Sequence, residues 1–578
     1  MTIKLSGGEI VARALADEGV RFAFGIPGTH NIELYDALGE SPTVRPVLVT
    51  DEQSASFMAD GVWRASGSLG CVNVVPGAGL THALSGIAEA FMDNVPLLVL
   101  GCGIRQDFQK SFQLHDVDQL AIAAPVTKAA FRVDRGAELY PEIRRACQLA
   151  RSGAPGPVMV EVPVNLYLQR HEVDPAAWTA PVPVPPPLPD APDIDSAVRQ
   201  LEADGVRPLL YLGLGAAGAG ADLVALAERL EAPVATTFQG KGVFPESHPL
   251  FLWNGFGDAA PPFAREVART RTATLAIGCR FSEVGTGSYG MAPPRPLVHV
   301  DIEPAVLGRN FPADLGVEAD AGAFVRALLP SLRARAVEPQ VRAAIRDGHA
   351  AVWKEWLAPV GKGSRVTPAY LLRELQQAFG PDTIYASDSG NGTFLAMECL
   401  RLERPGKFLA PVDYSCMGYS VPAALGAKLA RPDCPVVALA GDGAFLMTGL
   451  ELLTAANQGI AAAIFVLRDG ELAQIAQFQQ TALNRKTASV LPDYDVGTIA
   501  AGLGVESLHL RSDAEVPKVL GEVRECLGRG EPVVVDTAID YSRKTFFTAG
   551  VVKTNLLRFS WPERLRFIGR ALKRKVLG

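Results

Sequence analysis

Short apolar runs alternate with amphipathic helical stretches along most of this 578-residue chain. The runs are rich in β-branched residues and are continuously apolar, which is typical of strands buried on both faces of a parallel sheet. Examples are PVLVT, PLLYLG, VVALAG and AAIFVL. This pattern predicts α/β domains with helices on both sides of parallel sheets, and ligands at the carboxyl ends of the strands.

A proline-rich stretch divides the chain. The sequence AAWTAPVPVPPPLPDAPD at 176–193 can continue neither a helix nor a central strand, so we expect an extended surface linker. A softer boundary lies near 355–367, and a chain of this length is too long for one hydrophobic core. We expect three doubly wound domains and a tail, with these limits: domain 1–172, linker 173–191, domain 192–345, domain 366–540 and tail 541–578.

Composition excludes several classes of protein. Charged residues make up only 20% of the chain and apolar residues 48%, which rules out a mainly disordered protein. A net charge of −7 argues against nucleic-acid binding, and no apolar stretch reaches the ~18 residues of a membrane span. The eight cysteines lack metal-ligand spacing, and the amino terminus lacks a signal-peptide pattern. These features predict a cytoplasmic protein with reduced thiols.

Two strand ends carry residues that suggest chemistry. One buried strand ends in Gly441-Asp442-Gly443, and the next ends in Arg468-Asp469-Gly470. Adjacent parallel strands end at one edge of a sheet, so the two aspartates are expected to share a divalent cation. The glycines beside Asp442 and the helix that follows at Ala444 allow a phosphate to approach a helix N-terminus. The pattern predicts a Mg²⁺–diphosphate site; the alternative is a glycine-rich turn with two solvated aspartates.

These motifs resemble the thiamine-diphosphate-dependent enzymes of the acetolactate synthase, pyruvate oxidase and 2-oxo acid decarboxylase superfamily, over residues 3–540. The resemblance implies pyrimidine-binding, central and diphosphate-binding domains, in that order. It implies that thiamine diphosphate and Mg²⁺ bind, with the metal held by Asp442, Asp469 and the backbone carbonyl of Glu471. The family's two asparagines are replaced here by Arg468-Asp469. The added carboxylate is expected to strengthen Mg²⁺ binding and to repel the diphosphate somewhat.

Further motifs match the family's cofactor-binding positions. In VLVTDEQSASFMADG, Glu52 matches the catalytic glutamate that hydrogen-bonds N1′ of the aminopyrimidine; alone it would be an acidic residue at a helix N-terminus. In PVDYSCMGYS, Met417 matches an apolar side chain wedged between the two cofactor rings; alone it would be a core residue. The expected cofactor contacts are Gly390, Asn391, Gly392, Ser415, Met417, Gly441, Gly443 and Ala444.

Other motifs match positions that border the substrate. KSFQLHDVDQ matches the family's phenylalanine–glutamine pair at Phe112 and Gln113, and Gln113 is expected to take part in catalysis. TTFQGKGVFPESHPLF resembles a central-domain element with a lysine near the active site, here Lys241. The alternative for Lys241 is a solvated lysine in a glycine turn.

Two apolar positions and two histidines complete the expected pocket. Ile475 and Phe478 fall on the acceptor pocket of acetolactate synthases, where Phe478 replaces a tryptophan and puts a preference for 2-oxobutyrate in doubt. His30 and, less strongly, His82 are candidate proton donors near neutral pH. Alternatively, both are hydrogen-bonded neighbours of the site.

The resemblance implies an enzyme that decarboxylates a 2-oxo acid and joins the remainder to an acceptor carbonyl, most like acetolactate synthase. Since the pyrimidine and diphosphate sites lie on different domains, it also implies a homo-oligomer, either a dimer or a tetramer. Alternatives with the same cofactor are simple decarboxylation, C–C cleavage of a diketone or an acyl-CoA, and flavin-linked oxidation at a membrane. A non-catalytic binding subunit is a further alternative, against which the intact Glu52 argues.

The central domain matches the family's FAD-binding positions only in part, so FAD is kept as one of the alternatives. Arg280 and Asp301 keep two of these positions, but Ser282-Glu283-Val284 replaces the acidic and basic residues that usually follow the arginine motif. Ser560 and Glu563 have capping-box spacing, which predicts a basic amphipathic helix over 560–577 with Trp561 at its edge. Such a helix is a candidate peripheral membrane contact; docking on the protein's own surface or on a partner subunit is the alternative that we favour.

Overall fold

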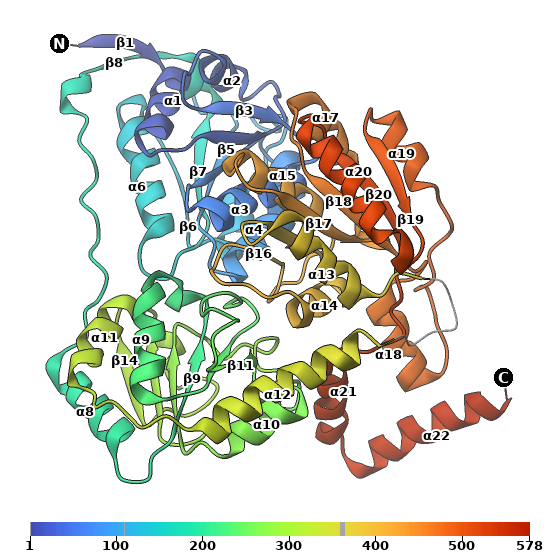
Figure 1. The fold of residues 1–578 in the computed structure, drawn as a ribbon. Helices are drawn as coiled ribbons and strands as arrows, with labels where there is room; N and C mark the ends of the chain where they lie inside the picture. Colours follow the sequence, from blue (N-terminus) through green and yellow to red (C-terminus); the bar gives the residue numbers. More distant parts are fainter. Residues whose placement is uncertain (1, 109, 359–364, 578) are drawn as a thin grey trace.

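The computed structural model describes residues 2–108, 110–358 and 365–577, without the side chains at 568, 572 and 575–577. Within these ranges, three six-stranded sheets flanked by helices form three α/β domains (Figure 1). All pairings inside these sheets are parallel. A separate antiparallel pair, β1 (Ile3–Ser6) and β8 (Arg170–Val173), joins the two ends of the first domain. The predicted fold class is confirmed.

The first domain has the strand order β3-β2-β4-β5-β7-β6. Successive residues of β5 belong to different cores, with Leu98 in one and Val99 in the other, because helices cover both faces. Its strands are β2 (Phe22–Gly25), β3 (Arg45–Leu48), β4 (Gly70–Val74), β5 (Leu97–Gly103), β6 (Ala129–Arg132) and β7 (Val158–Pro163). Its helices are α1 (Gly7–Asp17), α2 (Ile32–Gly39), α3 (Glu52–Ser66), α4 (Ala78–Met92), α5 (Gln119–Ala123), α6 (Leu139–Arg151) and α7 (Val164–Leu168).

The central domain follows an extended segment. Residues 178–190 form neither helix nor strand and run along the outside of the molecule (Figure 1). The sheet order is β11-β10-β9-β12-β13-β14. The strands are β9 (Pro208–Leu212), β10 (Val234–Thr236), β11 (Phe251–Asn254), β12 (Ala273–Ile277), β13 (Leu297–Asp301) and β14 (Leu315–Glu318). The helices are α8 (Ala191–Glu202), α9 (Gly220–Leu230), α10 (Pro262–Arg269), α11 (Ala321–Leu328) and α12 (Pro339–Trp356).

The third domain has the order β16-β15-β17-β18-β20-β19. Its strands are β15 (Ile384–Ser387), β16 (Phe408–Leu409), β17 (Val436–Gly441), β18 (Ala463–Arg468), β19 (Glu506–Leu510) and β20 (Val533–Ala538). Its helices are α13 (Pro368–Phe379), α14 (Asn391–Cys399), α15 (Ser420–Ala430), α16 (Asp442–Thr448), α17 (Leu452–Gln458), α18 (Ala473–Leu483), α19 (Val496–Gly502) and α20 (Val516–Gly528).

The tail contains two helices, α21 (Phe546–Arg558) and α22 (Trp561–Leu577). The predicted helix after residue 560 is present, and the Ser560 hydroxyl and backbone N–H both donate to Glu563 Oε2, at 2.9 and 3.0 Å. The sequence did not indicate α21. One end of α22 contacts α18, where Arg574 donates to the Leu483 carbonyl at 3.1 Å. Among the described residues, no helix combines the length and the apolar character needed to cross a bilayer.

Glycines allow the first and third domains to pack closely. A Cβ at Gly61 of α3 would lie 2.2 Å from the Ala423 carbonyl oxygen, and a Cβ at Gly426 of α15 would lie 2.0 Å from that of Met58. Real Cβ contacts are never this short, so a side chain at either glycine would separate α3 from α15. The α3–α15 contact is the most extensive between two helices of the described chain.

A buried aspartate connects all three domains. Asp93, at the end of α4, accepts hydrogen bonds from Arg64 of its own domain at 2.9 Å and from the Gln239 side chain of the central domain. It also accepts the backbone N–H groups of Val412 and Asp413 of the third domain, at 3.3 and 3.1 Å. Asp93 therefore makes direct hydrogen bonds within its own domain and to both of the others.

Candidate active site

The carboxyl edge of the first sheet carries Glu52. This residue begins α3 shortly after β3, and Asp51 caps the helix by accepting the Gln53 N–H at 2.7 Å. Glu52 is only 8% exposed, and its Oε2 lies 3.5 Å from Nδ1 of His82 on α4. The carboxylate of Asp51, which the sequence did not indicate, lies within 4.8 Å of the same two groups. The edge thus presents a buried carboxyl with a histidine beside it.

His30 lies at the same edge, after β2. Its ring is 5.5 Å from the ring of His115, edge to face. Burial and the neighbouring His115 lower the pKa of His30, so its imidazole is neutral at pH 7. His115 was missed from the sequence because its loop shows no spacing that relates it to His30.

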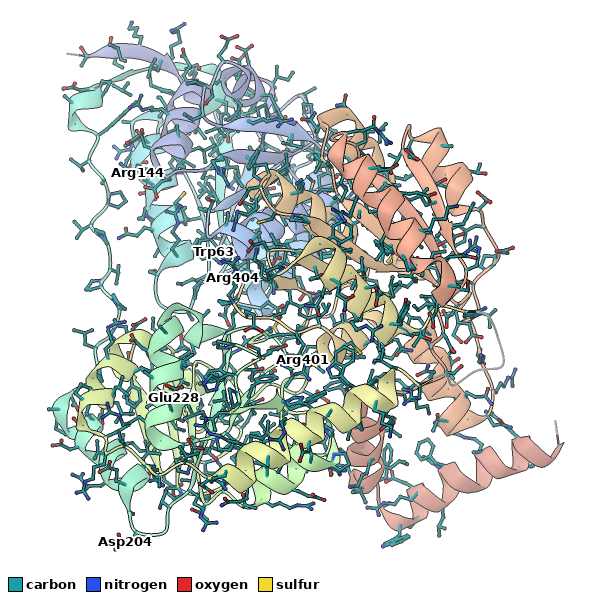
Figure 2. The ribbon with its side chains drawn as sticks, viewed as in Figure 1. Trp63, Arg144, Asp204, Glu228, Arg401 and Arg404 are labelled. Carbon is teal, nitrogen blue, oxygen red and sulfur yellow. The ribbon has the colours of Figure 1, made fainter. Side chains whose placement is uncertain are left out.

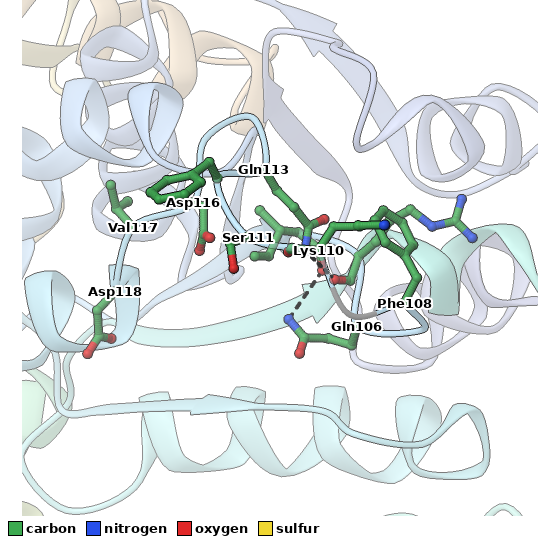
Figure 3. A pocket seen from close by; sticks show the side chains of 11 residues that line it. Gln106, Phe108, Lys110, Ser111, Gln113, Asp116, Val117 and Asp118 are labelled. Carbon is green, nitrogen blue, oxygen red and sulfur yellow. Dashed lines mark hydrogen bonds between the residues drawn. The ribbon is translucent and has the colours of Figure 1, made fainter.

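The loop that carries Phe112 and Gln113 borders an open cavity of about 680 Å³ (Figure 3). The Gln113 amide donates to the backbone carbonyls of Arg105 and Lys110, at 3.1 and 3.4 Å, so it is folded onto its own loop. Phe112 is fully exposed, with a left-handed φ of 61°. Both residues make no hydrogen bond or ring contact with the third domain in the described part of the chain. Phe108, Leu114 and Val117 of the same loop are also exposed, and a group of exposed apolar side chains is a candidate contact for another molecule.

The ends of β17 and β18 bring Asp442 and Asp469 to one edge, as predicted. Asp442 begins α16; its Oδ1 accepts the Gly443 N–H at 2.9 Å, and its Oδ2 accepts the Gly470 N–H at 2.8 Å. Burial and the nearby Asp442 raise the pKa of Asp469 to about 7. Two carboxylates that repel each other at a strand edge are a donor set that fits Mg²⁺.

Two further features bear on this metal site. The carbonyl of Glu471 accepts none of the hydrogen bonds found in the described ranges, so its lone pairs are free for a metal. Arg468 donates to Asp493 at 2.8 Å and to Asp536 at 3.3 Å. Because the Arg468 guanidinium is held by these two aspartates, it does not pair with the added carboxylate of Asp469.

The predicted cofactor residues of the third domain lie together. The hydroxyl oxygens of Ser389 and Ser415 are 2.8 Å apart, which joins the loop before α14 to the loop that contains Met417. A methyl group added to Gly443 would lie 3.5 Å from Met417 Cε, so this side chain borders the start of α16. Gly390 precedes α14 with a φ of 121°, which favours glycine.

A cavity of about 190 Å³ lies where the central domain, the third domain and the tail meet. Gly390, Ser415 and Phe478 of the predicted set line it. The lining residues that the sequence did not indicate include Phe238, Glu283, Gln474, Phe547 and Val551. These residues come from segments that lie far apart in the chain, and no local motif relates those segments. Ile475, beside Gln474 on α18, is 48% exposed and lies outside this lining.

The tail closes one side of this cavity. Glu398, at the end of α14, accepts the backbone N–H groups of Phe546 and Phe547 at 3.2 and 2.9 Å and so holds the N-terminus of α21. Burial raises the pKa of Glu398 to about 8. Phe547 stacks on Phe394, with ring centroids 4.5 Å apart.

Lys241 lies in neither of the two environments that the sequence suggested. Its ammonium donates to Glu246 and to the carbonyls of Met397 and Leu400, at 2.8–2.9 Å. These partners take all three ammonium hydrogens. Lys241 is 3% exposed and is absent from the lining of the 190 Å³ cavity, so these contacts favour a structural role.

The two residues that match FAD-binding positions are engaged with protein partners. Arg280 donates to Asp413 Oδ2 at 2.8 Å and to the Met92 carbonyl. Asp301 accepts the Glu303 N–H at 3.0 Å. We therefore assign no chemical step to a flavin.

Comparison with known proteins identifies the family. Residues 5–122, 194–328 and 388–537 match the N-terminal TPP binding, central and C-terminal TPP binding domains of thiamine pyrophosphate enzymes. A probable acetolactate synthase large subunit from Methanocaldococcus jannaschii is 31% identical over 93% of this chain and 92% of that protein. The acetolactate synthase large subunit of Corynebacterium glutamicum is 32% identical over 92% of this chain and 86% of that protein. The large subunit of acetolactate synthase isozyme 1 from Escherichia coli is 28% identical over 94% of this chain and 95% of that protein. The chain therefore belongs to the thiamine pyrophosphate enzymes and is an enzyme of the acetolactate synthase type.

Proposed function

We propose that this enzyme uses thiamine diphosphate and Mg²⁺ to decarboxylate a 2-oxo acid and to join the remaining acyl unit to an acceptor carbonyl. The observation that carries the proposal is the meeting of Asp442 and Asp469 at adjacent strand ends, beside a free backbone carbonyl and a helix N-terminus. Carboxylate and carbonyl oxygens suit Mg²⁺, and the helix N-terminus suits a phosphate.

Each group has a proposed task. Asp442, Asp469 and the Glu471 carbonyl hold the metal, while Gly390–Gly392 and the start of α16 contact the diphosphate. Bound thiamine diphosphate supplies a carbon nucleophile and an electron sink for decarboxylation. Met417 and the Ser415 carbonyl position the two rings, and Glu52 shares a proton with N1′ of the aminopyrimidine. Phe478 borders the acceptor, and Ile475, Phe112, Gln113 and His30 are proposed to approach the substrate when the site is assembled.

We also propose that the site forms between two copies of the chain, in a dimer or a tetramer. Among the described residues, the candidate metal-ligand side chains that lie within 4.8 Å of Glu52 and of one another are Asp51 and His82, and neither Asp442 nor Asp469 belongs to this group. Large apolar side chains are exposed in both domains. In the first domain these are Ile32, Leu48 and, in the loop after β5, Phe112 and Val117; after Asp442 they are Leu446, Met447, Leu450 and Leu453. Groups of exposed apolar side chains are typical of a subunit interface.

A mixing experiment tests the shared site. Glu52→Gln and Asp442→Asn, each inactive alone, are unfolded together, refolded and assayed. With random pairing, half of the chains enter mixed dimers. Each mixed dimer has one intact site and one site that carries both substitutions, so about a quarter of the wild-type activity returns. If each site lies within one chain, mixing restores no activity.

Product analysis tests the reaction itself. The purified protein is incubated with thiamine diphosphate, Mg²⁺ and a panel of 2-oxo acids, and CO₂ and coupled products are measured. Equal amounts of CO₂ and coupled product support carboligation, whereas free aldehyde indicates simple decarboxylation. An absorption spectrum of the same sample decides whether FAD is bound.

The place of the tail and the limits of the domains are part of the same proposal. We infer that α22 stays on the protein surface beside α18 and that the enzyme is cytoplasmic, which suits its free cysteines. Binding to anionic vesicles would contradict this placement.

We propose the domain limits 1–172, 192–345 and 366–540, since each matched range lies inside one of them.

A further inference from the structure

A third cavity, away from the proposed active site, lies between α12, the end of α13 and the segment after α14. Its volume is about 560 Å³. Trp353 of α12 and Leu357, directly after this helix, form an apolar wall, while Arg373, Gln377 and Arg401 provide polar groups. In Figure 2, Arg401 lies between the central and third domains, close to the middle of the molecule. We call this space the Arg401 cavity.

Arg401 is held in position by several contacts. Its backbone N–H donates to the Gln376 side-chain oxygen at 3.0 Å, and its carbonyl accepts from the Gln376 amide at 2.7 Å. Its guanidinium donates from Nη2 to Nδ1 of His349 at 2.7 Å and lies over the Trp253 ring at 5.8 Å. These contacts fix the guanidinium and leave Nε and Nη1 without a hydrogen-bond partner in the described chain.

The histidine beside Arg401 carries no charge. Its Nε2 contacts the Phe251 carbonyl at 3.0 Å and must donate there, so Nδ1 is an acceptor for the arginine. Burial and the positive charge of Arg401 lower the pKa of His349 to about 3. The positive charge therefore stays on Arg401 at neutral pH.

This charge lacks a full counter-ion. No carboxylate of the described residues lies within 4 Å of the Arg401 guanidinium nitrogens. Glu246 influences it electrostatically, but both Glu246 oxygens already accept from Lys241 and one also accepts the Leu402 N–H. Glu403, at the exposed rim of the cavity, also acts on Arg401 electrostatically, and it accepts from Ser247 at 2.7 Å. Lys241 and Arg401 thus share the buried carboxylate of Glu246, and the half-buried Arg401 guanidinium has no carboxylate of the described residues in direct contact.

We propose that the Arg401 cavity binds a small organic oxyanion, a phosphate or carboxylate attached to an apolar body. The N–H groups at Nε and Nη1 of Arg401 lie on different edges of the guanidinium. One of them, together with the second N–H of Nη2, binds two oxygens of the oxyanion. Arg373, which pairs with its neighbour Glu374 at 3.0 Å, adds positive charge at the opening. The apolar body lies against Trp353 and Leu357. The volume is too large for an inorganic ion alone and is within the range of small-molecule sites.

Calorimetry on the full-length protein tests this site. Saturating thiamine diphosphate and Mg²⁺ are present throughout, so that an added phosphate cannot occupy the diphosphate site. Phenyl phosphate and phenylacetate distinguish the two kinds of oxyanion, inorganic phosphate lacks the apolar body, and benzyl alcohol lacks the charge. The variant is Arg401→Gln. The matched control is Arg404→Gln, which removes the same charge from an exposed arginine paired with Asp382 outside the cavity (Figure 2).

The expected result is that at least one of the two organic anions binds, that benzyl alcohol does not, and that inorganic phosphate binds at least about tenfold more weakly. Arg401→Gln should weaken the organic anion at least about tenfold, and Arg404→Gln less than about twofold. Trp353→Ala, which alters only the apolar wall, should also weaken it and carries the test if Arg401→Gln does not fold. Absence of binding to the wild type, or equal losses in Arg401→Gln and Arg404→Gln, overturns the proposal.

Discussion

The ammonium of Lys241 lies 2.9 Å from both carboxylate oxygens of Glu246, and both side chains are 1% exposed. Removing one partner of a buried ion pair leaves the other charge uncompensated, which costs about 3–5 kcal/mol. We expect Lys241→Met to lower the free energy of unfolding by about this amount. The double variant Lys241→Met/Glu246→Gln should be more stable than the single one. Urea unfolding measures both, and a loss of turnover at unchanged stability would instead assign Lys241 to the substrate site.

Glu52 should be essential for turnover and unimportant for folding. Because its carboxyl is proposed to share a proton with the aminopyrimidine, Glu52→Gln should lower kcat by about 10²–10⁴-fold. Cofactor binding, measured by calorimetry, should change little. Glu40→Gln, at an exposed position after α2, is the control and should keep full activity. Turnover of Glu52→Gln within a few-fold of the wild type would refute the assigned role.

Replacement by asparagine should affect activity differently at the two strand-end aspartates, Asp442 and Asp469. Asp442→Asn removes a carboxylate whose oxygens also accept the Gly443 and Gly470 N–H groups, so we expect Mg²⁺-dependent activity to fall by about 100-fold or more. Asp469→Asn keeps an oxygen ligand and relieves the repulsion from Asp442. It should retain activity and require more Mg²⁺ for half-saturation. Titration of activity with Mg²⁺ distinguishes the two, and an equal loss in both variants would contradict the proposed geometry.

The contribution of Glu398 to the stability of the protein should depend on pH. Burial raises the pKa of Glu398 to about 8, above its unfolded value, so the folded state binds a proton more tightly than the unfolded state. Its contribution to stability is therefore greatest below the unfolded pKa of about 4.3 and declines as the pH rises towards 8. We expect the stability of the wild type relative to Glu398→Gln to fall between pH 5 and pH 8.5. Urea unfolding at several pH values checks this, and a constant difference would show that Glu398 does not titrate in that range.

The sequence predicted the parts of the fold and site that depend on local patterns. Continuous apolar runs predicted β17 and β18, and their ends placed Asp442 and Asp469 together. The environment of Lys241 was not predictable in this way, because its partners Met397 and Leu400 come from another domain.

The tail and the Arg401 cavity show the same limit. Helix α21 was missed because FFTAGVVKTNLLR has no clear apolar periodicity, and its position depends on a carboxyl of α14. The Arg401 cavity combines α12, α13 and the chain after α14, which no spacing in the sequence relates. Long-range packing decides all three features.

The close crossing of α3 and α15 has a consequence for synthesis of the chain. The face of α3 around Gly61 is covered by α15, which ends at Ala430. Domains fold in order as they leave the ribosome. This first domain, with its proposed limit at residue 172, however, must wait for about 250 further residues before α15, which begins at Ser420, covers this face of α3. We expect the nascent chain to depend on a chaperone until α15 has emerged.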